Sequence, residues 1–152
     1  MCQAASSRIE WKRRNTVTQD KNIAPARQLL ASLGERKDPD VIAAMFSESV
    51  VFEIPGDTEA LPWIGRRQTG RRAIAEFIRG LRSLTEPVKF DVQDILASDA
   101  RAVIVGELAT RIKATGKVIE FPFAIVLTVF SGQLTQFQLL ENSFAVSMAT
   151  RV

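Results

Sequence analysis

The chain offers few side chains that could carry out chemistry. Its 152 residues include no histidine, no tyrosine and a single cysteine, Cys2. Without histidine, neither a Ser-His-Asp nor a Cys-His nucleophile can be assembled, and a histidine-containing zinc or iron site cannot form. Proton transfer near neutral pH would therefore need a carboxylate or a lysine whose pKa is displaced by its surroundings. We expect neither a metal nor an organic cofactor.

Glu107 is the candidate catalytic residue. It alternates with Val103, Val105 and Ala109, so the carboxylate shares their apolar strand face. Burial on that face would raise its pKa and make it a candidate base for a proton transfer. The alternative is a structural role, in which Glu107 forms a salt bridge to an arginine on an adjacent strand or across a dimer interface.

Asn142 is a candidate ligand-binding residue because it continues an apolar alternation. It has the same parity as Leu134, Leu140 and Phe144, and so it is expected on their face of the last strand. An asparagine there can donate and accept hydrogen bonds to a carbonyl or hydroxyl group, but it cannot exchange a proton near neutral pH. The alternative is a hydrogen bond to the backbone of a neighbouring strand or loop.

Trp63 lies in a proline-containing loop that is expected over the mouth of a cavity. Its indole offers a wide apolar plate with one N–H donor, although it could instead anchor the loop to the core. Four further apolar residues are candidate ligand contacts, with a core role as the alternative for the aromatic ones: Phe46, Ile54, Phe77 and Phe123. If Ile54 points into the cavity, the carboxylate of Glu53 must point outward, because adjacent strand residues face opposite ways.

The charge of the chain is uneven. The net charge is +3, and residues 1–37 hold eight basic but only three acidic side chains. A second basic group falls within residues 66–82 and consists of Arg66, Arg67, Arg71, Arg72, Arg79 and Arg82. A solvated helix face explains this group, and an anionic partner such as an acidic protein is the alternative. We expect no nucleic-acid binding, because aromatic residues for base stacking are scarce.

The elements that must position these residues can be read from hydrophobic periodicity and turn signals. Helices are predicted over residues 24–35, from Asp38 with Pro39 at the first helical position, and from Thr69 or Gly70 to Leu84. Strands are predicted over Ser49–Ile54, Val88–Leu96, Arg101–Lys113, Val118–Phe130 and Gln133–Ala145. Because the last strands are long, we expect bends or bulges in them.

This order predicts an α+β fold, in which a curved antiparallel sheet packs against three N-terminal helices to form a cone. We divide the chain into a flexible basic tail (1–23), a single domain (24–148) and a short C-terminal tail (149–152). The longest apolar run, Phe121–Phe130, is about half the length of a membrane helix. We therefore expect a cytoplasmic protein without membrane contact.

Several short motifs carry a family resemblance. They are VFEIPG (Val51–Gly56), LPWIG (Leu61–Gly65), GRRAIAEF (Gly70–Phe77), Pro122-Phe123, SGQL (Ser131–Leu134) and LLEN (Leu139–Asn142). In this order and spacing the chain resembles the SnoaL-like branch of the nuclear transport factor 2-like superfamily. The resemblance implies a homodimer with a conical, mostly apolar pocket. Members include ketosteroid isomerases, polyketide cyclases, limonene epoxide hydrolases and non-catalytic binding modules.

The catalytic positions that the resemblance implies carry the wrong residues for these reactions. Ile54 stands where ketosteroid isomerases place a general base, and Leu30 stands near their tyrosine donor. Asn142 occupies the last-strand position of the acid in epoxide hydrolases and cyclases, and the other acid and arginine of the hydrolases fall near Gly106 and Leu108. We therefore predict a binding protein for a small apolar molecule. The alternatives are a cofactor-free isomerase, polyketide cyclase or epoxide hydrolase that uses a buried carboxylate, and a protein-interaction module.

Overall fold

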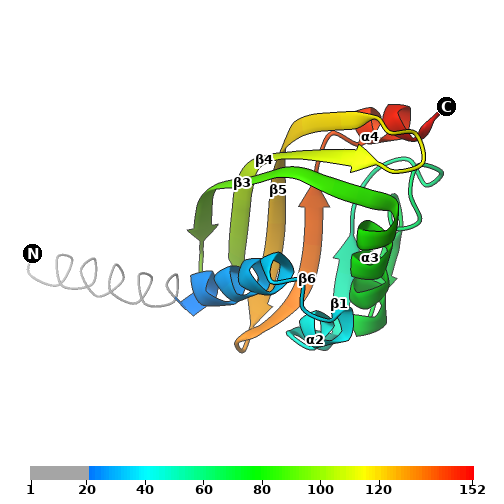
Figure 1. Ribbon diagram of the computed structural model, residues 1–152. Helices are drawn as coiled ribbons and strands as arrows, with labels where there is room; N and C mark the ends of the chain where they lie inside the picture. The colour runs from blue at the N-terminus through cyan, green and yellow to red at the C-terminus, as the bar shows by residue number, and fades with distance from the viewer. Residues whose placement is uncertain (1–20) are drawn as a thin grey trace, which may run out of the picture.

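The computed structural model describes residues 21–152 (Figure 1). Most of the expected basic tail, with Cys2, lies outside the described residues. A helix over residues 21–34 comes first, and its residues 21–23 fall within the segment expected to be tail. The elements that follow are α2 (Pro39–Ala43), β1 (Phe46–Glu53), β2 (Arg67–Thr69), α3 (Arg71–Leu84), β3 (Thr85–Ala97), β4 (Arg101–Ile112), β5 (Val118–Phe130), β6 (Gln133–Leu140) and α4 (Ser143–Thr150).

The strands form one six-stranded sheet in the order β2-β1-β6-β5-β4-β3. The four strands from β3 to β6 make an antiparallel meander, whereas β1 pairs parallel to β6. The α+β fold is confirmed, but the sheet is mixed rather than purely antiparallel. Figure 1 shows the long strands bending around the helix over residues 21–34, with α3 standing beside β1.

Local sequence signals explain where the elements begin and turn. In α2, Pro39 occupies the first turn and the side chain of Asp38 accepts a hydrogen bond from the N–H of Asp40 at 2.9 Å, which is the expected N-cap geometry. The β5–β6 turn consists of Ser131 and Gly132, both with positive φ (49° and 75°). Tight hairpin turns require this conformation, which glycine adopts without steric cost.

Bulges bend the sheet. Register shifts interrupt the β3–β4 ladder between Pro87 and Lys89 and again between Val92 and Asp94. A third shift lies in the β5–β6 ladder, between Thr128 and Val129. Each bulge adds twist and bends the strand that carries it, so the expectation of bent strands is confirmed.

The core fills one end of the space between the helices and the inner face of the sheet. Phe52 and Phe137 stack with their ring centroids 5.6 Å apart, and Phe77 of α3 approaches both rings. The helix over residues 21–34 is attached to the sheet at its β3 edge, where Asn22 Nδ2 donates to the carbonyl of Ser98 at 2.6 Å. The helices within residues 21–152 pack on the inner face of the sheet.

The expected last strand is too long by five residues. β6 ends at Leu140, and the chain then forms α4 from Ser143 to Thr150. Asn142 starts this helix, because its side-chain oxygen accepts a hydrogen bond from the N–H of Ala145 at 3.0 Å. An asparagine at this position satisfies a donor that the first helical turn leaves unpaired. The prediction missed this capping role and also missed the short strand β2.

Candidate functional site

A cavity of about 510 Å³ lies between the helices and the bent sheet. Its walls come from the helix over residues 21–34, from α3, from the loop that carries Trp63 and from the inner face of strands β3 to β6. Most of the lining is aliphatic or aromatic. Four of the residues expected to contact a ligand line it: Phe46, Trp63, Phe77 and Phe123. Their role in binding stays a prediction.

Trp63 forms part of the cavity wall because it is fixed against α3. Its ring meets that of Phe77 edge-on, with the centroids 5.6 Å apart, and only 6% of its surface is exposed. Gly80 makes room for the indole, since a Cβ added there would lie 2.7 Å from Trp63 Cζ3. Trp63 therefore both anchors its loop and presents an apolar wall to the cavity.

The structure places Ile54 in the solid core. Its side chain is fully buried and does not line the cavity, which corrects our expectation of a ligand contact. Just after the end of β1, its carbonyl accepts a hydrogen bond from the N–H of Gly65 at 2.7 Å. Ile54 thus holds the Trp63 loop against the end of β1.

Glu107 lies on the outer face of the sheet, opposite to the cavity. Lys89 Nζ lies 3.2 Å from its carboxylate and 3.1 Å from that of Glu120. These two partners, Glu120 first, raise the pKa of Lys89. The Glu107 side chain is 44% exposed, so it is neither buried nor in the cavity. The structure therefore favours the salt-bridge alternative, with a lysine in place of the expected arginine.

Asn142 also lies outside the cavity. It is exposed at the start of α4, and its side-chain oxygen is engaged in the cap described above. The reason for the wrong expectation is the β5–β6 bulge, where Val129 pairs with Leu134 but Thr128 pairs with Gln136. One extra residue in β6 reverses which residues face inward.

Glu141 lines the cavity where residue alternation had predicted Asn142. After the bulge, the inward residues of β6 are Phe137 and Leu139, and the next residue of that parity is Glu141. All three line the cavity. Sequence reasoning missed Glu141, and only the position of the bulge would have revealed it.

The carboxyl group of Glu141 has an unusual protonation equilibrium. Burial raises its pKa from the ordinary value of 4.5 to about 7, because the apolar surroundings disfavour the charged form. Desolvation is the sole cause that acts on it within residues 21–152. Near neutral pH this group is therefore divided between its neutral and ionised forms, which is the condition for an efficient proton donor or acceptor.

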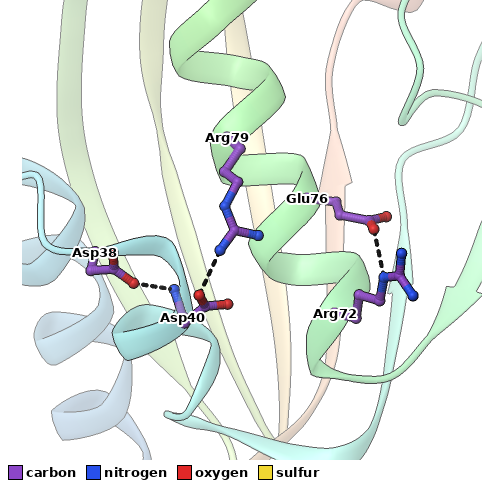
Figure 2. A network of polar contacts seen from close by, with 5 residues as sticks. All are labelled: Asp38, Asp40, Arg72, Glu76 and Arg79. Carbon is purple, nitrogen blue, oxygen red and sulfur yellow. Dashed lines mark hydrogen bonds and ion pairs between the residues drawn. The ribbon is translucent and has the colours of Figure 1, made fainter.

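The arginines of α3 are mostly paired with acids. Figure 2 shows Arg79 Nη2 reaching Asp40 of α2 at 2.6 Å, while Arg72 Nε contacts Glu76 one turn further along its own helix at 2.7 Å. These exposed pairs neutralise much of the basic face that could otherwise attract an anionic partner. The solvated-face interpretation of this segment therefore fits the geometry better than a docking surface does.

The helix-covered curved sheet with a hollow interior defines a class of α+β domains, and the sequence places the chain within it. The SnoaL-like domain family matches residues 26–137. The chain therefore belongs to the SnoaL-like family, as the sequence motifs predicted. No curated protein matches the chain.

Several solved structures are similar to this chain. A nuclear transport factor 2-like protein from Burkholderia xenovorans LB400 has 21% identity over 88% of this chain and 98% of its own length, with a TM-score of 0.77. A protein from Xanthomonas campestris, named as a candidate polyketide cyclase, has 16% identity over 88% and 99%, with a TM-score of 0.69. An LEH-like epoxide hydrolase from M. tuberculosis has 18% identity over 87% and 90%, with a TM-score of 0.64. At these identities the likeness establishes the fold.

Between residues 21 and 152, none of the helices has the length and apolar character needed to cross a membrane.

Proposed function

We propose that this protein binds a small, mostly apolar organic molecule in the cavity behind Trp63. The cavity carries the proposal, because its volume of about 510 Å³ falls in the range of small-molecule sites, roughly 300–1,000 Å³. Aromatic and aliphatic side chains make up most of its lining, and one carboxyl group, that of Glu141, breaks the apolar surface. Few polar groups in an apolar hollow are typical of a site that selects a ligand by shape and orients it at one point.

A neutral fluorescent probe tests this proposal. N-phenyl-1-naphthylamine should bind with one saturable site per chain, because transfer of its rings into the cavity removes apolar surface from water. A bulky substitution at a lining residue, Leu108→Trp, should weaken binding at least tenfold. The matched control is Val41→Trp on α2, where the side chain is 57% exposed. Absence of saturable binding to the wild-type chain, or equal binding by both variants, would contradict the proposal.

A second candidate function is catalysis without a cofactor, with Glu141 as the acid or base. It is favoured by one observation, a carboxyl group with a pKa of about 7 in the apolar cavity. Isomerisation, cyclisation and epoxide opening each need a proton to be taken or given at such a site, and proteins with this fold carry the names isomerase, polyketide cyclase and epoxide hydrolase. Glu141 thereby replaces Glu107 as the catalytic candidate.

Deuterium exchange tests the base function without knowledge of the natural substrate. With 2-tetralone in D₂O, ionised Glu141 would take a proton from the carbon beside the carbonyl and leave an enolate. Return of a solvent-derived deuteron would then label the ketone. Exchange above the buffer rate should rise with pH through about 7, and Glu141→Gln should abolish it. Glu53→Gln, on the outer sheet face, is the control. Exchange no faster than in buffer, or unaffected by Glu141→Gln, would contradict base catalysis.

We also propose that the protein is a homodimer. The outer face of the sheet, which the described helices leave uncovered, presents apolar side chains from neighbouring strands, among them Val103, Val105, Ala124 and Val126, all only partly buried. A second copy of the same face would remove these side chains from water.

A further inference from the structure

One arginine of α3 differs from its neighbours in having a buried end without a partner. Within residues 21–152, only Ser47 Oγ and Arg82 Nη2 are buried side-chain polar atoms that make no hydrogen bond. Arg79 and Arg72, on the same helix, reach carboxylates. A guanidinium N–H that is removed from water without an acceptor is costly, so a shift of the Arg82 side chain that brings this group to an acceptor from outside the chain would be favourable.

Arg82 is positioned by the end of α3. It lies in the last turn of that helix, and its carbonyl accepts a hydrogen bond from Lys113 Nζ at 3.0 Å, just beyond β4. Next to it, Thr85 Oγ1 donates to the carbonyl of Leu81 at 2.6 Å. These contacts fix the backbone, and the side chain of Arg82 is part of the cavity lining.

The charged groups of the cavity wall favour an anion. Two arginines, Arg36 and Arg82, line it against the single carboxyl group of Glu141. Lys89 also contributes to the wall, but its ammonium group pairs with Glu107 and Glu120 on the outer face. Arg36 is exposed. Arg82 is therefore the cation of the wall that is partly buried and, within residues 21–152, forms no ion pair with a carboxylate. An oxyanion is the acceptor that a guanidinium binds most strongly.

We propose that the cavity ligand is an amphipathic carboxylate, whose carboxylate accepts a hydrogen bond from the Arg82 guanidinium while its hydrocarbon body packs against the apolar lining. This inference rests on the proposed binding function and specifies the chemical class of the ligand. It gives each end of the ligand a partner, the guanidinium for the carboxylate and side chains such as Leu108, Phe121 and Ile125 for the hydrocarbon.

Competition between two ligands of equal chain length tests the inference. Decanoate and decan-1-ol differ in their polar end, so their abilities to displace N-phenyl-1-naphthylamine report on the carboxylate. A charge-assisted hydrogen bond predicts that the wild-type protein binds decanoate about tenfold more tightly than the alcohol. Arg82→Gln should remove this preference while leaving the affinity for decan-1-ol unchanged. Arg82→Lys, which keeps the charge, should retain part of it.

Arg79→Gln is the matched control, since Arg79 lies on the same helix but pairs with Asp40 at the surface. It should leave both affinities unchanged. Equal binding of decanoate and decan-1-ol by the wild-type protein would overturn the inference, as would equal weakening of both by Arg82→Gln. If the naphthylamine probe binds and only the preference is missing, the proposed binding function stands alone. If neither the probe nor the two ligands bind, the binding function and this inference fail together.

Discussion

Glu141 and Asn142 are adjacent in the sequence but have opposite surroundings. The carboxyl group of Glu141 is largely buried in the cavity, whereas the amide of Asn142 is exposed and caps α4. The residue types alone would favour the reverse arrangement, because a carboxylate is costlier to bury than an amide. A carboxyl group that is buried against its solvation preference lowers the stability of the fold, and such groups occur often at functional sites.

The cost of burying Glu141 predicts a pH-dependent stability. Its pKa is about 7 in the folded chain against 4.5 ordinarily, so the folded state holds the proton more tightly than the unfolded state. Stability should therefore be highest below about pH 4.5 and fall as the pH rises towards 7. At about 1.4 kcal/mol per pH unit, the loss is about 3 kcal/mol. Glu141→Gln should recover most of it at pH 8 and little at pH 4.5.

Urea unfolding of both proteins at the two pH values measures this difference. Glu59→Gln, in the exposed loop before Trp63, controls for the general effect of removing a carboxylate. A stability difference between Glu141→Gln and the wild type that is the same at both pH values would show that the carboxyl group is not desolvated.

Among the elements, those with strong local signals could be predicted from the sequence. The capped start of α2 at Asp38, the apolar stripe of α3 and the Ser131-Gly132 turn all lie where the pattern placed them. What could not be predicted is the bulge between Leu134 and Gln136, because it is set by the fit of β6 to β5 and not by its own residues. Because the extra residue reverses the inward face of β6, alternation along the strand predicted Asn142 in the cavity, whereas Glu141 lies there.

The contact between α3 and the Trp63 loop makes Gly80 a sensitive position. Alanine is normally the better helix former by about 1 kcal/mol, but its Cβ at position 80 would meet the indole at 2.7 Å. Gly80→Ala should therefore lower the free energy of unfolding by about 1–3 kcal/mol and shift the tryptophan emission. Gly34→Ala is the matched control, since no atom lies within 4 Å of the added methyl group, and it should be neutral or stabilising. An equal response of the two variants in thermal unfolding would contradict the packing argument.

On the scale of the whole molecule, the described helices and the hollow made by the sheet bends lie on the same face of the sheet. The helices pack on the inner face, where bulges open a hollow that the aromatic core fills only in part. The outer face then has no covering layer within residues 21–152. A half-apolar sheet face without a layer over it is unusual for a monomer, so the arrangement that produces the cavity also produces the candidate dimer surface.

The dimer proposal predicts that one charge on the outer face will separate the two copies. Val126 of β5 lies opposite Val103 of β4 and Gln138 of β6, near the middle of that face. Val126→Arg would bury an unpaired guanidinium at the centre of a symmetric interface, which costs several kcal/mol. Analytical ultracentrifugation should give a dimer of the 16.8 kDa chain for the wild type and a monomer for this variant. Val41→Arg, on the exposed side of α2, should remain dimeric.

A monomeric wild type, or a Val126→Arg variant that stays dimeric, would contradict the proposal. Retained naphthylamine binding by the monomeric variant would show that each copy forms its own cavity.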